Sequence, residues 1–105
     1  MKIAITSDGN SLDSKLDSRF GRCSYFAIYD TDNKQVDFFH NICKNSIEGA
    51  GPASVQFVAS KGVHKVVSGE FGLKVKSLFE CLRIETIVLN ETDKPITKII
   101  EMLNI

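Results

Sequence analysis

Short apolar runs separated by polar segments mark the first forty residues of the chain. The runs cover residues 2–6, 25–29 and 36–40, and each has the length and the β-branched or aromatic content of a strand. Residues 30–34, Asp-Thr-Asp-Asn-Lys, favour a turn, so the second and third runs are predicted to form a hairpin. Residues 7–22 carry few apolar side chains, and we expect a long solvated loop there.

The second half of the chain changes to helical spacing. Three helices are predicted, and their apolar positions are, in chain order, Val55, Val58 and Ala59; Phe71, Val75, Leu78, Phe79 and Leu82; and Ile96, Ile99, Ile100 and Leu103. Pro52 suits the start of the first helix, and Gly62 its end. Pro95 opens the last helix, with Thr92 and Asp93 as candidate caps.

Two further strands, residues 63–68 and 86–89, lie between the predicted helices. The order is then three strands, helix, strand, helix, strand, helix. A meander followed by right-handed crossovers gives a mixed five-stranded sheet with helices on both faces. We therefore predict a three-layer α/β fold of the ribonuclease H-like type, with strand order 3-2-1-4-5 and strand 2 antiparallel. One domain is expected over residues 1–105.

Composition narrows the classes of partner. Hydrophobic residues make up 43% of the chain and charged residues 25%, which is enough for a packed core. Thirteen Lys and Arg balance thirteen Asp and Glu, so a nucleic-acid partner is disfavoured. No apolar run approaches the roughly 20 residues that span a bilayer, so no membrane partner is expected. Three cysteines, an odd number, without an export signal indicate reduced thiols and a cytoplasmic protein.

Strand directions in the predicted fold gather a set of candidate residues at one edge of the sheet. The first, third and fourth strands end there, and the second strand begins there. The set comprises Ser7, Asp8, Arg19, Phe20, Gly21, Arg22, Cys23, His40, Cys43, Gly49, Gly51 and Gly69. Open α/β sheets bind ligands at this edge, where helix N-termini favour an anion and the two arginines strengthen that preference.

Each candidate also has a purely structural explanation. Cys23 precedes an aromatic strand and can pack inward, while Cys43 lies among polar residues and can be an idle surface thiol. His40 ends an apolar strand, and the arginines and glycines can serve as solvated charges and turns. The spacing of the cysteines does not suit a structural zinc site. Cys81 is expected at the opposite edge, packed beside the apolar stripe of the second helix.

Two blocks of the sequence are specific, Phe20-Gly21-Arg22-Cys23 and Gly49-Ala50-Gly51-Pro52, and they are supported by Lys2-Ile3-Ala4-Ile5, Asn41 and Gly69-Glu70-Phe71-Gly72. Together these blocks resemble the dinitrogenase iron-molybdenum cofactor biosynthesis family. The resemblance implies a ribonuclease H-like fold and a protein, not an enzyme, that carries an iron-sulfur or iron-molybdenum-type cluster. It also implies partners that deliver or receive the cluster.

One position departs from the family pattern. Many members carry histidine directly before Phe-Gly, and Arg19 stands there in this chain. Arginine cannot ligate a metal in the ordinary way, but it can pair with an anionic cluster. The resemblance therefore leaves ligation to Cys23, with Cys43 or His40 in place of the missing imidazole, since thiolates suit iron.

Three hypotheses follow. The first is a cluster carrier with Cys23 as ligand, Arg19 and Arg22 as counter-charges, and residues 8–18 as a lid that orders around the cargo. The second is a metal-independent regulatory or interaction module that binds a small anion or a partner protein. The third is a magnesium-dependent nuclease, for which only Asp8 and Glu70 are available as carboxylates.

Overall fold

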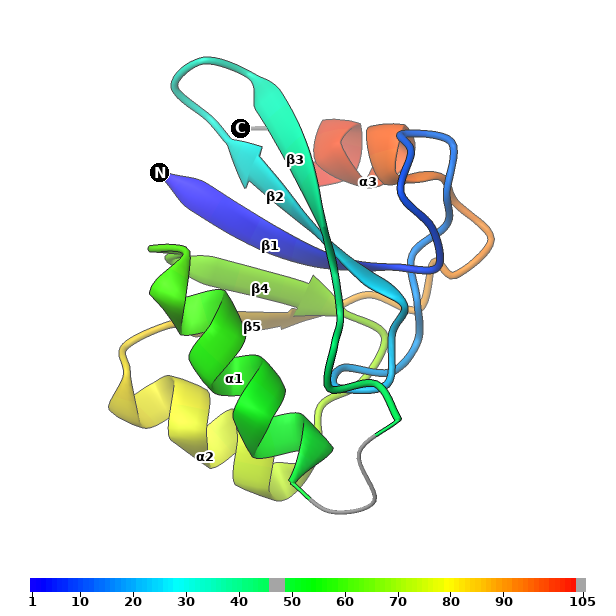
Figure 1. Cartoon of the computed structure of the whole chain (residues 1–105). Helices are drawn as coiled ribbons and strands as arrows, with labels where there is room; N and C mark the ends of the chain where they lie inside the picture. The colour runs from blue at the N-terminus through cyan, green and yellow to red at the C-terminus, as the bar shows by residue number, and fades with distance from the viewer. Residues whose placement is uncertain (46–48, 104–105) are drawn as a thin grey trace.

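The computed structural model, which describes residues 1–45 and 49–103, contains one five-stranded sheet and three helices (Figure 1). In chain order the elements are β1 (Lys2–Ser7), β2 (Tyr25–Asp30), β3 (Gln35–His40), α1 (Ala50–Ser60), β4 (Lys65–Ser68), α2 (Leu73–Cys81), β5 (Glu85–Val88) and α3 (Ile96–Leu103). The strand order is β3-β2-β1-β4-β5. β2 is antiparallel to β1 and β3, whereas β4 is parallel to β1 and β5. The predicted fold is confirmed.

Alternation along the strands divides the core between the two faces of the sheet. Ala4, Phe26 and Val66 join residues of α1 and α2 in one cluster, which we call the two-helix cluster. Neighbouring strand residues, such as Ile5 and Val67, join α3 in a second, the one-helix cluster. Helices therefore cover both faces, which gives the three layers.

The helices are short and partly shifted from the expected pattern. The longest, α1, has 11 residues, and no helix in the described part of the chain is long and apolar enough to cross a membrane. α2 begins only at Leu73, so Phe71 packs from the preceding loop.

Cys81 was expected to pack inward, and this is wrong: it is exposed. It follows the buried Phe79 by two residues, about 200° around the helix, and so faces away from the core.

The segment after β1 is not the mobile lid that its polar composition suggested. Asp8 and Lys15 bond to each other through their backbones, and Leu16 is only 2% exposed, inside the one-helix cluster. The carbonyls of Ser14 and Leu12 accept the first N–H groups of α3, at 2.7 and 3.1 Å. We call residues 8–16 the α3 loop. Its own backbone caps α3, the role expected of Thr92 and Asp93.

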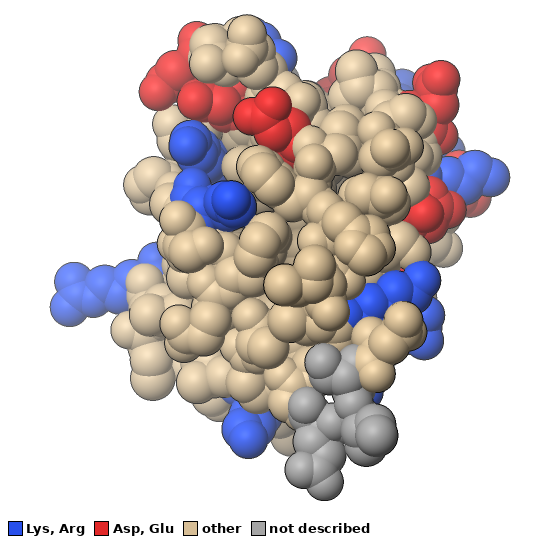
Figure 2. Space-filling model, viewed as in Figure 1, with Lys and Arg blue, Asp and Glu red and all other residues tan. Residues whose placement is uncertain are grey.

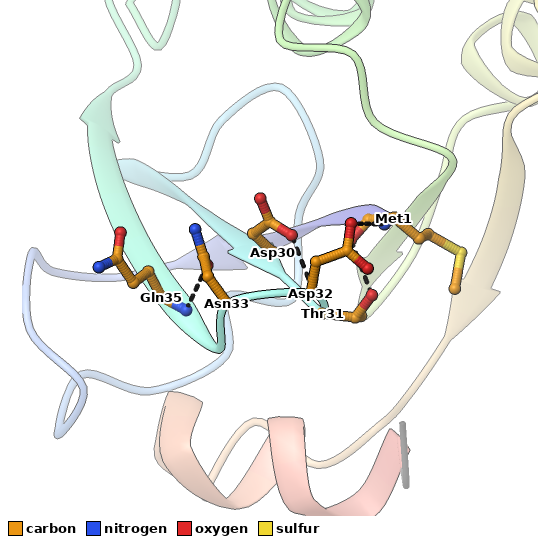
Figure 3. A network of polar contacts seen from close by, with 6 residues as sticks. All are labelled: Met1, Asp30, Thr31, Asp32, Asn33 and Gln35. Carbon is orange, nitrogen blue, oxygen red and sulfur yellow. Dashed lines mark hydrogen bonds and ion pairs between the residues drawn. The ribbon is translucent and has the colours of Figure 1, made fainter.

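The turn that joins β2 to β3 is held by hydrogen bonds from its own side chains (Figure 3). Asp30 accepts the backbone N–H of Asp32, and Asn33 accepts that of Gln35, each at 2.9 Å. The Asp32 carboxylate also lies 3.4 Å from the amino group of Met1. These contacts explain why residues 30–34 form the predicted turn.

Candidate functional site

The strand ends meet at one edge of the sheet, as predicted. Ser7 at the end of β1 is paired with Tyr25 at the start of β2, and Tyr25 is paired with His40 at the end of β3. β4 runs parallel to β1 and ends at Ser68. We call this the carboxyl edge, because four of the five strands end there and only β2 begins there.

The segment before Cys23 is fixed against the junction between β4 and α2. The carbonyl of Asp17 accepts the Thr6 hydroxyl at 2.8 Å and the Gly69 N–H at 3.4 Å. A Cβ on Gly69 would lie 2.5 Å from the Cα of Ser18, so only glycine allows this approach. Gly69 is one of the binding candidates named from the sequence, and in the structure its N–H is already bonded to Asp17.

The starts of α1 and α2 meet beside this segment. Gly21 has φ +90°, and a Cβ there would lie 3.2 Å from the Cα of Gly51. A Cβ on Gly51 would in turn lie 2.7 Å from Val75 in the first turn of α2. Gly49 and Gly72 hold the N-cap positions and have no side chain to cap the first N–H groups. Two helix N-termini therefore concentrate partial positive charge at one place.

Phe20 belongs to the core and not to a binding surface. Its ring is 9% exposed and lies within 5.2–5.7 Å, between centroids, of the rings of Phe26, Phe71 and Phe79. The predicted cofactor contact is therefore not available to its side chain. Phe20 instead anchors the segment that carries Arg19 and Gly21.

Cys23 is sealed inside the two-helix cluster, with no exposed surface. Burial, with a smaller contribution from the Asp17 carboxylate, raises the pKa of its thiol from the ordinary 9.0 to about 12. Hydrogen bonds from the Asn41 side chain and the Ser7 backbone act in the opposite direction. In this conformation Cys23 is a protonated packing residue, the structural alternative that its position before an aromatic strand left open.

Asn41 organises this edge, a role that was not assigned from the sequence. The side chain is 3% exposed, and its Nδ2 donates to the carbonyls of Gly21 and Cys23, both at 3.0 Å. Nδ2 also lies 3.9 Å from the sulfur of Cys23, while Oδ1 accepts the N–H of Cys43 at 3.0 Å. Both polar atoms of this buried amide are hydrogen-bonded, so the side chain fixes the local backbone. The sequence feature that could have identified this role is the presence of Asn41 among the residues that resemble the family.

The three expected metal ligands do not form one site. Phe39 packs in the two-helix cluster, so the next residue, His40, projects to the other face of the sheet, against Tyr25 at 5.2 Å between ring centroids. Cys23 lies on the two-helix side, and Cys43 is half-buried. Within residues 1–45 and 49–103, no three His, Cys, Asp or Glu side chains are grouped to hold a metal ion.

Basic side chains lie on the same edge. Arg19 is exposed and follows Ser18 at the β4–α2 junction, while Arg22 donates to the carbonyl of Lys44 at 2.8 Å, next to Cys43. Two acidic residues lie beside them: the Asp17 carboxylate accepts the backbone N–H of Arg19 at 2.9 Å, and the Glu70 carbonyl accepts the N–H of Phe20. Figure 2 shows acidic side chains toward the top of the view and basic ones around the sides and lower part.

Ser7 and Asp8 serve the backbone locally. The Ser7 hydroxyl is buried and donates to the carbonyl of Gly9 at 2.7 Å. The Asp8 carboxylate accepts the N–H of Lys15 at 2.8 Å and so belongs to the α3 loop. Neither side chain has a free place at the carboxyl edge in this conformation.

Known proteins resemble this chain along most of its length. An uncharacterized protein of Methanocaldococcus jannaschii is 32% identical over 95 residues, which cover 88% of this chain and 77% of that protein. The apo form of the orange protein of Desulfovibrio gigas has a TM-score of 0.91 at 23% identity, over 98% of this chain and 86% of that one, and shows the fold alone. A Thermotoga protein provisionally named NifB, of the DUF35 family, has a TM-score of 0.84 at 27% identity, with 98% and 86% covered. The model of the dinitrogenase iron-molybdenum cofactor family matches residues 1–104, and the chain therefore belongs to that family.

Proposed function

We propose that this protein is a non-catalytic carrier that transiently holds an anionic iron-sulfur or iron-molybdenum-type cluster at the carboxyl edge. The cluster is cargo, received from one protein and passed to another. Membership of the iron-molybdenum cofactor family supports the class of cargo. The edge supplies the three kinds of group that such a cargo needs: donors, positive charge and a soft ligand.

The observation that carries the proposal is the meeting of two side-chain-free helix starts with two arginines. Gly51 and Val75 bring the first turns of α1 and α2 into contact, so their N–H groups face one region. Arg19 and Arg22 flank Phe20-Gly21, which packs against Gly51. Backbone donors and guanidinium groups together favour a multiply charged anion over a neutral ligand.

First contact between metal and protein falls to Cys43. Its thiol is half-buried and free, and its backbone is held by Asn41 beside the carbonyl that Arg22 binds. Thiolate is a suitable ligand for iron in such clusters. Arg19 occupies the position of the family histidine and contributes charge where that residue would contribute an imidazole nitrogen.

Anaerobic reconstitution with ferrous iron and sulfide tests the proposal. The wild type should gain bound iron and the visible absorption of sulfur-to-iron charge transfer, and Cys43→Ala should lose most of both. Cys81→Ala is the matched control, because it removes an exposed free thiol from the far end of α2. Arg19→Gln should weaken retention at raised salt concentration. Colourless, iron-free wild-type protein, also when purified without oxygen, would contradict the proposal.

A second candidate is a metal-independent module that binds a small anion at the same helix starts. The observation that favours it is the sealing of Cys23, which leaves one accessible thiol at the edge. Binding of an anion that survives Cys43→Ala but is lost in Arg19→Gln would select this function. Loss of binding in Cys43→Ala would select the carrier.

A further inference from the structure

We propose that Asn41 is a latch over Cys23, and that Cys23 and Cys43 form a paired thiolate site for a soft metal once its amide is displaced. This inference rests on the proposed function, because it names the second ligand of the same site. It makes Cys23 a metal ligand, a role that its complete burial in the structure described above would otherwise exclude.

One amide holds both cysteine residues. Nδ2 of Asn41 bonds to the Cys23 carbonyl and Oδ1 to the Cys43 N–H, each at 3.0 Å. Two such bonds to one planar amide place these backbone atoms within about 8 Å of each other. Nδ2 also lies 3.9 Å from the Cys23 sulfur, between that thiol and the segment carrying Cys43. Displacing this one side chain therefore removes the group that contacts the Cys23 thiol and frees the backbone of Cys43, which the same amide holds.

The latch can open without unfolding the sheet. Among the described residues, hydrogen bonds from residues 41–45 reach only residues 21–24. Besides the bonds of the Asn41 side chain, they run from the backbone of Asn41 to Ser24, from Lys44 to Ser24, and from Arg22 to Lys44. Residues 41–45 lie outside the helices and strands, so their release breaks a small and contiguous set of contacts.

The chemistry of the open state is ligand exchange without electron transfer. Each thiol loses its proton to solvent, each sulfur forms one bond to the metal, and two ligands of the incoming metal leave. Arg22, one residue before Cys23, supplies positive charge beside the new thiolates. Metal at Cys43 would then compete with Asn41 for the space over Cys23, so loading and opening favour each other.

Alkylation of individual cysteines with iodoacetamide, mapped by mass spectrometry, tests the latch. In Asn41→Ala, Cys23 should react at least about tenfold faster than in the wild type, the effect of removing hydrogen bonds to the closed state, while Cys81 should not change. Ile99→Ala, in the one-helix cluster on the other face, is the control for general destabilisation. Equal acceleration of Cys23 in both variants would overturn the inference, as would no acceleration in Asn41→Ala.

The wild type provides a second measurement that does not depend on the stability of a variant. Alkylation of Cys23 through a local opening should change little with urea below the unfolding transition, because little surface is exposed. A steep dependence that matches global unfolding would contradict the latch.

Cadmium titration separates this inference from the proposed function. Sulfur-to-cadmium charge transfer should appear in the wild type and weaken in both Cys23→Ser and Cys43→Ser, with Cys81→Ser unchanged. If iron and sulfide bind but Cys23→Ser alters neither probe, the latch fails and the carrier stands. If cadmium needs both thiols but no cluster forms, the carrier fails and the latch stands.

Discussion

The start of α3 differs from the starts of α1 and α2 in how the first N–H groups of the helix are bonded. Every helix begins with N–H groups that have no partner within the helix. In α3 they bond to the carbonyls of Ser14 and Leu12, more than eighty residues earlier in the chain. In α1 and α2 the N-cap residues are Gly49 and Gly72, which have no side chain to offer. Among the residues that the structure describes, the chain supplies acceptors for the first N–H groups of α3 but no side-chain cap for those of α1 and α2 at the carboxyl edge.

Two leucines show the same contrast. Leu16 ends the α3 loop and is 2% exposed, whereas Leu73 begins α2 and is 87% exposed. A leucine exposed to this extent beside a helix start contributes little to folding. The comparison indicates that polar composition alone does not identify a functional loop, since the polar α3 loop is the closed region.

Leu16→Ala should have the largest effect on stability. Removing a buried leucine side chain costs about 2–5 kcal/mol, and the loss should release the α3 loop from α3. Leu73→Ala is the matched control, expected to change the free energy of unfolding by less than about 0.5 kcal/mol. Urea titrations of both variants measure the difference. Similar small losses in both would mean that the α3 loop is the mobile lid after all.

Gly69→Ala should come next, because it tests how firmly residues 17–20 are fixed at the open edge. The added Cβ would meet the backbone of Ser18 at 2.5 Å, and forced overpacking of this kind costs about 2–3 kcal/mol. Gly72→Ala meets no atom within 4 Å and has an ordinary φ of −66°, so its cost should stay below about 1 kcal/mol. Equal stabilities of the two variants in urea would show that this segment moves aside freely.

The fold could be predicted from the sequence because its determinants are local. Apolar alternation identified the β2–β3 hairpin, and the polar residues between these strands make the turn bonds that close it. Strand directions then fixed which ends share an edge, so the meeting of residues 7, 25 and 40 followed without any knowledge of side-chain contacts.

The side-chain contacts of the site could not be predicted in the same way. The α3 loop is held by carbonyls of Leu12 and Ser14, which every residue type possesses, and no residue pattern marks them. The face that His40 takes depends on strand register, which was not assigned. Asn41 differs from an ordinary turn residue only through contacts to Gly21 and Cys23, about twenty residues earlier.

Cys23 is an exception to this contrast, because it lies at the carboxyl edge and yet is as buried as Leu16. Its thiol has a pKa of about 12 in the folded protein, against 9.0 when exposed, so the unfolded chain loses its proton first as pH rises. The stability that the buried neutral thiol provides is complete below pH 9 and declines toward pH 12, by about 1.4 kcal/mol per pH unit at most. The advantage of the wild type over Cys23→Ala should therefore shrink by roughly 1–2 kcal/mol between pH 8 and pH 10 in urea titrations. Cys81→Ala, which removes an exposed thiol, should follow the wild type throughout. A constant difference between the wild type and Cys23→Ala would mean that solvent reaches Cys23 in the folded state, and the carboxyl edge would then be open at both thiols.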